Sequence, residues 1–503
     1  MKRQLRGGRG VPRPRDALLR ALPVIHVVSA AILLFSLAFL VPMGVSLALG
    51  DGAVGLYLTG FTITALFGLV LFVATRGQQR RELQPRDGFL LVALVWTVVP
   101  AFATIPLLAG IEGLSVTDAY FEAVSGLTAT GATVITGLDG LPASLNIWRT
   151  LLHWLGGMGI IVLAVAILPL LGVGGSQLFK AEFPGAMKDT KITPRIGDMA
   201  KGLWGVYALL TVACILALHW AGMNWVDATA HAFSTMALGG FSTKDASVGH
   251  FNSPAIEAVL VVFMLVAAIN FATHFLAFRQ RSLQPYGRDV EARYVVGWLA
   301  ASIVGMSFFL LVSGTASDMP SALRLAAFHV VSVATTTGFS TADYAQWPAF
   351  AGFWLVFLAA VSSSSGSTGG GIKMIRAEVL VRQTFREMTR IIHPRAVLPV
   401  KLGAVVIENN VIFSVLAYML MYGGTLIVMT MLLLASGLDP VTAFTAVFAC
   451  VNNLGPGLGQ VGPASTYAVL SDFQTWVCTL TMLLGRLELF TLVVLVTPAF
   501  WRK

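Results

Sequence analysis

Residues 329–341 read His329-Val-Val-Ser-Val-Ala-Thr-Thr-Thr-Gly338-Phe-Ser-Thr341, a short apolar run that ends in threonines and a glycine. Related stretches occur at 122–131, 231–240 and 446–455, and in each the glycine lies nine residues after the first residue. A serine stands six residues before the glycine in three copies, and Ala449 replaces it in the fourth. Four such copies, each between long apolar segments, predict four pore loops around one axis, which is how one chain can build an ion selectivity filter.

These copies have a simpler interpretation as glycine, serine and threonine motifs that pack membrane helices together. For a single copy that interpretation would be preferred. Four copies in register, all on the same predicted side of the membrane, favour a pore.

The composition is that of an integral membrane protein. The chain has 503 residues, 56% hydrophobic and only 11% charged, whereas soluble domains carry about 25% charged residues. Several apolar stretches exceed the ~20 residues that cross a bilayer as a helix. The predicted fold class is therefore an all-α polytopic membrane protein, with ten spans near 22–44, 54–75, 88–110, 147–173, 202–222, 254–278, 294–315, 349–372, 403–436 and 466–499.

The basic residues fix the expected orientation. Of the 33 lysines and arginines, 29 lie in segments that the ten spans place on one side: 1–20, 76–86, 180–201, 279–293, 373–401 and 502–503. Since loops rich in lysine and arginine stay inside the cell, both termini are expected in the cytoplasm. An even number of spans agrees with this expectation.

We expect six parts along the chain. A basic cytoplasmic arm (1–20) precedes an extra pair of N-terminal helices (21–85). Four pseudo-symmetric repeats of helix, pore loop and helix follow, at 86–180, 181–288, 289–398 and 399–503.

Each pore loop is expected to begin with a short helix. Asp118 and Asp227 stand thirteen residues before their glycines and are expected to be the N-caps of two such helices. A half-membrane helix directs its partially negative C-terminal end toward the membrane centre, which favours a cation there. Glycine then permits backbone angles that other residues avoid, so that carbonyl groups can be exposed.

The four stretches resemble the glycine segments of the Trk/Ktr/HKT superfamily of potassium transporters, in particular the TrkH-type membrane subunit. The resemblance runs from about residue 20 to the C-terminus and includes the extra N-terminal helix pair. The signatures are Thr128-Ala-Thr-Gly-Ala-Thr133, Leu238-Gly-Gly-Phe-Ser-Thr243, Thr336-Thr-Gly-Phe-Ser-Thr341 and Asn452-Asn-Leu-Gly-Pro-Gly-Leu-Gly459.

The resemblance implies a selectivity filter for K⁺, with one glycine per repeat. The ion is the transported substrate, held at Thr130, Gly131, Gly240, Thr337, Gly338 and Gly455, and no cofactor is implied. Leu238-Gly239 and Asn453-Leu454 depart from the threonines of the first and third copies, so a less symmetrical filter is expected. The filter residues are Thr130, Gly131, Ala132, Leu238, Gly239, Gly240, Phe241, Thr337, Gly338, Phe339, Asn453, Leu454 and Gly455.

A serine- and glycine-rich run interrupts the span at 349–372. Its spacing approaches a nucleotide-binding P-loop, but Ile372 precedes Lys373 and Met374 follows it, so that signature fails. In the family, the similar segment is an intramembrane loop below the filter that obstructs the pore; the alternative is a simple kink. We expect a gate made of Ser362, Ser363, Ser364, Ser365, Gly366, Ser367, Thr368, Gly369, Gly370, Gly371 and Arg486.

Arg486 lies deep in the last predicted span, where an arginine normally faces a cavity or a partner. The family implies that it faces the pore; otherwise it extends to the inner interface. Glu488 is a candidate partner, although residues two apart on a helix diverge. His231 and His329 are expected to hydrogen-bond within the pore-helix scaffold rather than to sense protons.

Three further sets of residues have two interpretations each. Lys373 and Arg376 are expected to anchor the gate helix at the interface. Asp139, Asp245 and Asp343 either raise the local cation concentration or form a solvated surface. The basic segments 176–201 and 373–401 either contact anionic lipid or, as the family implies, receive a cytosolic nucleotide-binding TrkA-type regulatory subunit.

The predicted function is potassium uptake across the cytoplasmic (inner) membrane of a prokaryote. The family implies a homodimer in the lipid bilayer with one pore per protomer, no nucleic-acid partner and no enzymatic activity. One rival is a symporter that moves K⁺ with H⁺ or Na⁺, or a Na⁺-permeable relative. Another is an intramembrane enzyme that uses Ser362–Ser365 or a histidine, but it would leave the fourfold pattern unexplained.

Overall fold

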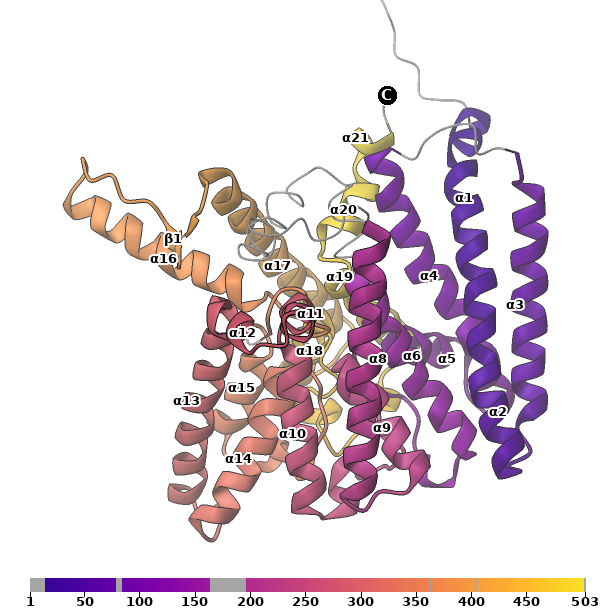
Figure 1. The fold of residues 1–503 in the computed structure, drawn as a ribbon, viewed down its shortest axis with the longest axis horizontal. Helices are drawn as coiled ribbons and strands as arrows, with labels where there is room; N and C mark the ends of the chain where they lie inside the picture. The colour runs from indigo at the N-terminus through magenta and orange to yellow at the C-terminus, as the bar shows by residue number, and fades with distance from the viewer. Residues whose placement is uncertain (1–13, 78–83, 163–195, 362, 404, 502–503) are drawn as a thin grey trace, which may run out of the picture.

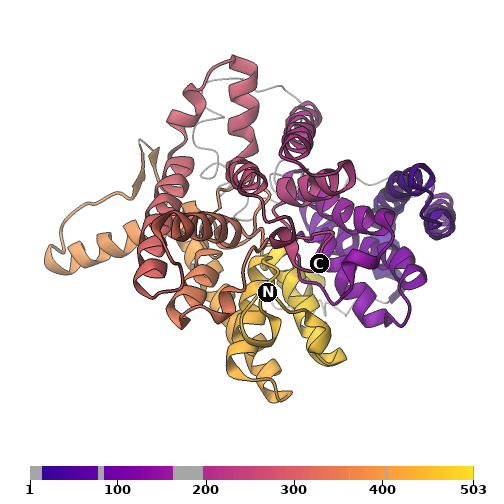
Figure 2. The same cartoon turned by 90° about the horizontal axis from the view of Figure 1, so that it is seen from below.

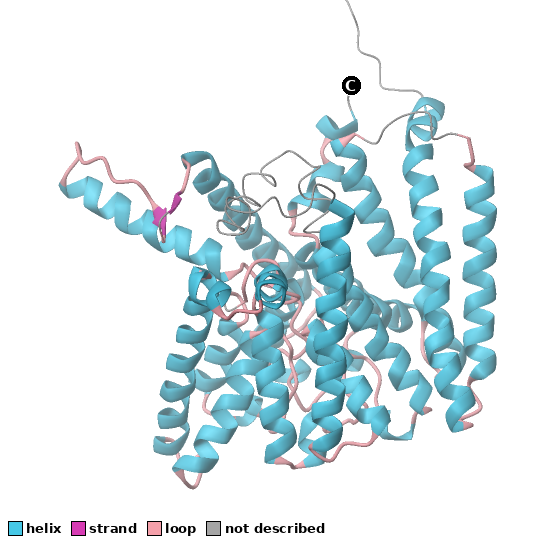
Figure 3. Cartoon of the chain, viewed as in Figure 1, coloured by secondary structure: helices cyan, strands magenta, loops and turns pink. Residues whose placement is uncertain are grey.

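The computed structural model describes residues 14–77, 84–162, 196–361, 363–403 and 405–501. Most of the basic arm, the end of the span predicted at 147–173, much of the segment 176–201 and the gate residue Ser362 therefore lie outside the described residues. The described part consists almost entirely of helices, which confirms the all-α polytopic prediction (Figure 3).

The first helices stand side by side at one edge of the molecule (Figure 1). They are α1 (Pro14–Ser36), α2 (Leu40–Leu49), α3 (Val54–Ala74) and α4 (Pro85–Gly110). Two of their aromatic side chains, Phe39 and Tyr57, are fully buried in the core that they share with α5 and α6. The extra N-terminal pair is thus packed against the rest of the protein by apolar burial.

The remaining α-helices of the described residues differ widely in length, from 4 to 27 residues. They are α5 (Val116–Leu127), α6 (Ala143–Val162), α8 (Ile196–Trp220), α9 (Trp225–Ala237), α10 (Pro254–Ala268), α11 (Phe271–Gln280), α12 (Gln284–Arg288), α13 (Val290–Val312), α14 (Met319–Ala334), α15 (Ala349–Leu358), α16 (Met374–Ile392), α17 (Asn409–Ala435), α18 (Pro440–Asn452), α19 (Asp472–Arg486), α20 (Phe490–Val496) and α21 (Pro498–Trp501). Seen from below, successive parts of the chain surround a common centre in chain order (Figure 2).

Six of the predicted spans correspond to unbroken helices that are long and apolar enough to cross a membrane. They are those near 22–44, 54–75, 88–110, 202–222, 294–315 and 403–436. Each of the spans predicted at 254–278 and 466–499 contains two helices instead of one, which bend by 95° between α10 and α11 and by 113° between α19 and α20.

Local backbone chemistry produces both bends. Asn270 caps α11 by accepting from the backbone N–H of Ala272, so a new helix begins there in a new direction. At the second bend, Glu488 and Leu489 both have positive φ angles, which end α19. The span predicted at 349–372 also stops early, since α15 ends at Leu358 and a loop follows.

Helix α16 projects from the body and leads into a small antiparallel hairpin of β1 (Lys401–Leu402) and β2 (Val405–Val406) (Figure 1). Helix α1 begins and α21 ends on one face of the molecule, called the terminal face below (Figure 1). The opposite face is called the mouth face. That the terminal face is cytoplasmic remains a prediction from the distribution of basic residues.

Candidate functional site

Four short helices, α5, α9, α14 and α18, extend from the mouth face into the interior (Figures 1 and 2). Their N-caps are Ser115, Asn224, Asp318 and Asp439, and each side chain accepts a hydrogen bond from the backbone N–H three residues further on. The prediction that Asp118 and Asp227 are the N-caps is wrong. Both lie in the first turn, where a carboxylate is favoured by the helix dipole, and each accepts from the cap side chain.

Each short helix is followed, within two residues, by a residue with a positive φ angle. These residues are Ala129, Leu238, Thr336 and Asn453, with φ between 50° and 63°. The glycine segments 128–133, 238–243, 336–341 and 452–457 are numbered first to fourth, and apart from Asn452, the last residue of α18, none of their residues is helical. Gly131, Gly240 and Gly338 have φ of 79°, 81° and 85°, a conformation that a side chain would oppose.

The four glycine segments form a closed ring, called the glycine ring. A Cβ atom added to Gly131 would meet the carbonyl of Gly239 in the second segment, and one added to Gly240 would meet that of Thr337 in the third. The third segment lies against the fourth in the same way, because a Cβ at Gly338 would approach Pro456 Cδ to 2.8 Å. A Cβ at Gly455 would be 2.6 Å from the carbonyl of Gly131, which closes the ring.

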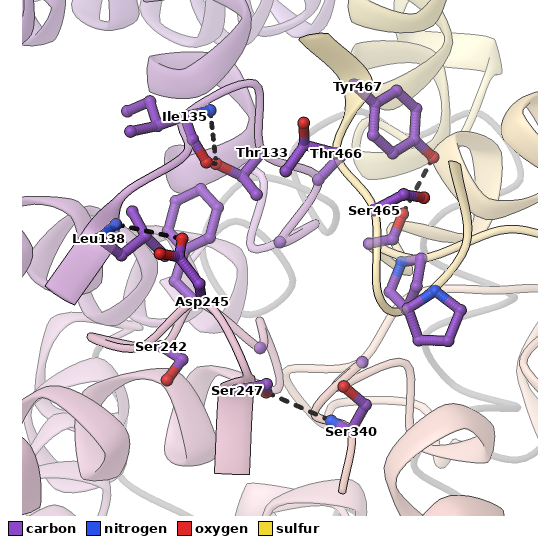
Figure 4. Close-up of a pocket in the computed structure, with 18 of the residues that line it drawn as sticks. Thr133, Ile135, Leu138, Ser242, Asp245, Ser247, Ser340, Ser465, Thr466 and Tyr467 are labelled. Carbon is purple, nitrogen blue, oxygen red and sulfur yellow. Dashed lines mark hydrogen bonds between the residues drawn. The ribbon is translucent and has the colours of Figure 1, made fainter. Parts of the chain in front are cut away.

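The ring forms the floor of a pocket that opens on the mouth face (Figure 4). Hydrogen bonds join neighbouring segments at its wall. Leu138 N–H donates to Asp245 Oδ1 (3.1 Å), and Ser340 N–H donates to Ser247 Oγ (3.3 Å). Tyr467 N–H donates to the carbonyl of Thr133 (2.8 Å) and so connects the last part of the chain to the first segment.

Side chains of the short helices brace the glycine segments. Ser234 Oγ donates to the carbonyl of Phe241, and Ser332 Oγ to that of Phe339, both at 2.7 Å. These are the serines that recur six residues before the glycine. They fix the carbonyl that follows it, so two copies of the sequence pattern have a defined structural role.

The histidines also brace the segments, as predicted. His231 Nδ1 donates to the carbonyl of Asp227, and its Nε2 accepts from Ser242 Oγ (2.9 Å). His329 uses Nε2 to accept from the backbone N–H groups of Thr341 and Ala342, both at 3.3 Å. Nδ1 of His329 lies 2.8 Å from the carbonyl oxygen of Leu325. Because a carbonyl can only accept, the proton lies on Nδ1 in each ring.

The fourth segment differs from the other three. The hydroxyl of Tyr467 donates to the carbonyl of Gly455 (2.9 Å), whereas Gly455 is not among the glycines with positive φ. Asn453 Nδ2 donates to Thr130 Oγ1 (3.0 Å) and thereby connects the fourth segment to the first. The departure noted at Asn453-Leu454 thus accompanies a different local arrangement.

The described part of the serine- and glycine-rich run, 363–371, lies directly beneath the ring on the side away from the mouth. Gly370 N–H donates to Thr336 Oγ1, and Thr368 Oγ1 donates to the carbonyl of Met236, both at 2.9 Å. A Cβ at Gly370 would clash with the carbonyl of Asn452. The run therefore contacts the C-terminal ends of α9, α14 and α18. From here on, residues 363–371 are called the loop.

Arg486 lies under the ring and is 3% exposed. Its Nη1 donates to the carbonyl of Thr368 in the loop (3.0 Å), and its Nη2 to that of Gly156 in α6 (3.2 Å). Glu488 instead pairs with Arg376 at 2.8 Å, so the candidate pairing of Glu488 with Arg486 is wrong. The break after α19 turns the two side chains in different directions.

Lys373 and Arg376 do not simply anchor an interface. Lys373 Nζ donates to the carbonyl of Gly369 within the loop. Arg376 is 2% exposed, and its guanidinium stacks 4.4 Å from the centre of the Tyr418 ring. Lys373 therefore contacts the loop from its C-terminal side, whereas Arg376 pairs with Glu488 and fixes the first turn of α16, which follows the loop.

The acidic residues of the mouth have partners. Asp139 Oδ1 lies 3.3 Å from Lys244 Nζ, and Asp139 Oδ2 accepts from the N–H of Asp245. Burial raises the pKa of Asp139, but the hydrogen bonds from Asp245 and Lys244 lower it more, so its pKa lies below the ordinary value. Asp343 caps a short 3-10 helix at Tyr344–Gln346.

The candidate residues therefore fall into two adjacent groups: thirteen in the ring, and the loop with Arg486 beneath it. Residues that the sequence did not single out for a site include Tyr467, Thr336 and the buried pair Glu122 and Arg149. Arg149 could have been noticed as one of the few basic residues outside the segments of the terminal face.

Long apolar helices around a central ring of backbone define the protein as a multi-pass membrane transport protein. The model of the TrkH family, described as a cation transport protein, matches residues 57–503. The chain belongs to this family.

The relatives agree with this assignment. The chain is 47% identical over 481 residues to the Trk system potassium uptake protein TrkH of Halomonas elongata, covering 95% of this chain and 99% of that protein. It is 36% identical to the Trk system potassium uptake protein TrkG of Escherichia coli, covering 95% and 98%. The crystal structure of the potassium transporter TrkH from Vibrio parahaemolyticus superposes with a TM-score of 0.88 at 42% identity, covering 96% of this chain and 99% of that one. Since these relatives are transport proteins, the expectation that the chain is not an enzyme is confirmed.

Proposed function

We propose that the protein takes up K⁺ across the inner membrane of a prokaryote through the glycine ring. The observation that carries the proposal is the closure of the ring by four backbone segments, each at the C-terminal end of a short helix. Backbone carbonyls at such a position can replace the hydration shell of a cation. The relatives are named potassium uptake proteins, and this indicates K⁺ as the transported ion.

The ring residues would act as a selectivity filter. K⁺ would contact Thr130, Gly131, Gly240, Thr337, Gly338 and Gly455. The hydrogen bond from Tyr467 to the carbonyl of Gly455 supports a filter in which the fourth segment binds K⁺ less strongly than the others, because that carbonyl already has a partner. Four N-capped helices that end below the mouth support cation binding there through their dipoles.

The loop and Arg486 would form the gate. Gly370 and Thr368 contact the helix ends immediately beneath the ring, and Arg486 holds the carbonyl of Thr368 from the other side. An ion that leaves the ring would meet the loop before the terminal face. Opening would require the loop to exchange these hydrogen bonds for others.

We further propose a homodimer and a TrkA-type regulatory subunit that docks on the terminal face. Support comes from the relatives' names, which describe components of a Trk system. Among the described residues of the ring and the loop, nothing favours ion-coupled symport over conduction.

The test is uptake of rubidium and sodium into proteoliposomes, with the wild type beside Gly131→Ser. We expect rubidium uptake to exceed sodium uptake, and the preference to be lost in the variant because the added side chain meets the second segment. Gly314→Ser is the matched control: Gly314 also has a positive φ of 73°, but a Cβ there meets no atom within 4 Å. Equal uptake of both ions by the wild type would contradict the proposal.

A further inference from the structure

Only four basic residues lie outside the segments assigned to the terminal face: Arg149, Lys244, Arg324 and Arg486. Lys244 and Arg324 are partly exposed, with 22% and 40% of their side chains accessible, and pair with acidic residues. Arg486 contacts the loop. Arg149 is buried beside the glycine ring, and burial of a charge costs free energy that its partners must offset.

Arg149 in α6 joins the first two glycine segments. Its Nη2 donates to Thr133 Oγ1 in the first segment (3.2 Å), and its Nη1 donates to the carbonyl of Ser242 in the second (3.2 Å). The guanidinium also lies 4.3 Å from the centre of the Phe241 ring, next to Gly240. One planar group therefore contacts both segments at once.

Glu122 in α5 is the counter-charge. Its Oε1 accepts from Arg149 Nη2 (2.7 Å) and Nε (2.9 Å), and both side chains are 1% exposed. The same carboxylate holds the first segment directly, because Oε1 accepts from Thr133 Oγ1 and Oε2 from the N–H of Val134, both at 3.1 Å. The ion pair and the backbone of the first segment thus form one network.

The position of Glu122 has a counterpart in every copy of the pattern. His231 and His329 occupy it in the second and third copies, and the described hydrogen bonds that each makes to a glycine segment go to the segment of its own copy. Ala446 occupies it in the fourth, where the neighbouring Thr445 accepts from the N–H of Leu458 instead. The first copy has a carboxylate at this position, and among the described residues it is the copy in which this position is linked by hydrogen bonds, through Arg149, to the next segment.

We infer that Glu122 and Arg149 form a clamp that sets the spacing of the first and second glycine segments and thereby determines the preference for K⁺ over Na⁺. This inference rests on the proposed function. Gly131 and Gly240 each stand two residues before the residue that Arg149 contacts, Thr133 and Ser242. If the clamp is lost, their carbonyls can move closer to a smaller ion, so discrimination between the two ions declines.

Both residues are positioning residues, because the ion contacts the glycine segments and not the clamp. A merely structural role would lower the amount of folded protein, and hence total uptake, without changing the ratio of two ions measured on the same vesicles. The uptake ratio is therefore the decisive quantity. It is independent of how much protein each preparation incorporates.

The experiment measures rubidium and sodium uptake into proteoliposomes by the full-length wild type, Arg149→Gln, Arg149→Lys and Glu122→Gln. For Arg149→Gln we expect the rubidium-to-sodium ratio to fall by about tenfold, equivalent to about 1.4 kcal/mol. Arg149→Lys retains the charge but not the planar fork, so an intermediate ratio is expected. Glu122→Gln should also lower the ratio, because it removes the charge that orients Arg149.

Arg324→Gln is the matched control. Arg324 and Glu257 form an ion pair of the same length, 2.7 Å, and the described hydrogen bonds of Arg324 go to Glu257 and Asn252. This variant should retain the wild-type ratio.

A wild-type ratio in both Arg149→Gln and Glu122→Gln, with only total uptake reduced, would overturn the clamp while leaving the proposed function intact. If neither of these variants yields monodisperse protein, Arg149→Lys decides, and an unchanged ratio there overturns the clamp. A ratio near one in the wild type itself would overturn the proposed function and the clamp with it.

Discussion

Arg486 Nη1 donates a hydrogen bond of 3.0 Å to the carbonyl oxygen of Thr368, although the two residues are 118 positions apart in the chain. The bond joins the end of α19 to the loop beneath the glycine ring. It is charge-assisted and buried, so it stabilises the loop in the position where it lies across the proposed ion path. The first two predictions below follow from the way this loop is held.

Replacing Arg486 by alanine should raise rubidium uptake in the absence of any partner subunit. The change removes hydrogen bonds to Thr368 and Gly156, and a bond to a charged group contributes about 1.5–3 kcal/mol. We expect at least a tenfold increase in initial uptake rate, since about 1.4 kcal/mol corresponds to a factor of ten. An unchanged or lower rate, with normal incorporation into vesicles, would contradict the proposed gate.

Glu488→Gln should also loosen the loop, by removing the charge that Arg376 faces at 2.8 Å. Arg376 is buried whereas Glu488 is 34% exposed, so loss of the carboxylate leaves a buried guanidinium with less compensating charge. We expect a lower melting temperature in detergent and a higher uptake rate. Glu378→Gln is the control, since its pair with Arg382 is partly exposed and contributes only about 0–1 kcal/mol. Equal melting temperatures for the two variants would argue against a role for Arg376 in holding the loop.

Ser332→Ala should reduce ion selectivity modestly. The hydroxyl of Ser332 donates to the carbonyl of Phe339 at 2.7 Å, and the net contribution of such a bond is about 1 kcal/mol. We expect the rubidium-to-sodium uptake ratio to fall by roughly threefold to fivefold. Ser125→Ala is the matched control, because the buried hydroxyl of Ser125 has no hydrogen-bond partner among the described residues. A larger effect at Ser125 than at Ser332 would count against the brace.

Lys244→Gln should increase the apparent affinity for rubidium. Lys244 lies at the mouth, and its loss leaves Asp139 with a less compensated charge at the entrance. The hydrogen bond from the N–H of Asp245, which also lowers the pKa of Asp139, remains in the variant, so the carboxylate keeps its charge throughout the neutral range. We expect the half-saturating rubidium concentration to fall by about twofold at low ionic strength, and the difference to shrink in 0.5 M choline chloride, through screening. A difference that persists at high salt would exclude an electrostatic cause.

Local patterns in the sequence identified the elements from which the site is built. The nine-residue spacing to Gly131, Gly240, Gly338 and Gly455 predicted four related segments, and all four lie in the ring. The run after Ser362 predicted a break in a span, because serine and glycine in succession favour neither a helix nor a lipid-facing surface. These features depend on neighbouring residues in the chain, so one sequence suffices to recognise them.

One local prediction was wrong, and two predicted spans contain a bend, for reasons that are also local. The N-caps lie three residues before Asp118 and Asp227, because Ser115 and Asn224 precede them and can cap equally well. The spans at 254–278 and 466–499 are broken, although their apolar composition is continuous. An apolar segment has the same hydropathy whether it is buried in lipid or in protein. Hydropathy therefore does not distinguish a straight helix from a bent one.

The sequence by itself determined the membrane class, the four glycine segments and the interrupted span. Only the tertiary structure decided which distant groups meet: Arg149 with Glu122 and Ser242, Arg486 with Thr368, and Tyr467 with Gly455. The physical reason is that a buried charge or hydroxyl must find a partner wherever the folded chain supplies one. Secondary-structure propensity and hydrophobic periodicity depend on residues that are close in the chain. These contacts instead form only when the whole chain folds and the ring closes.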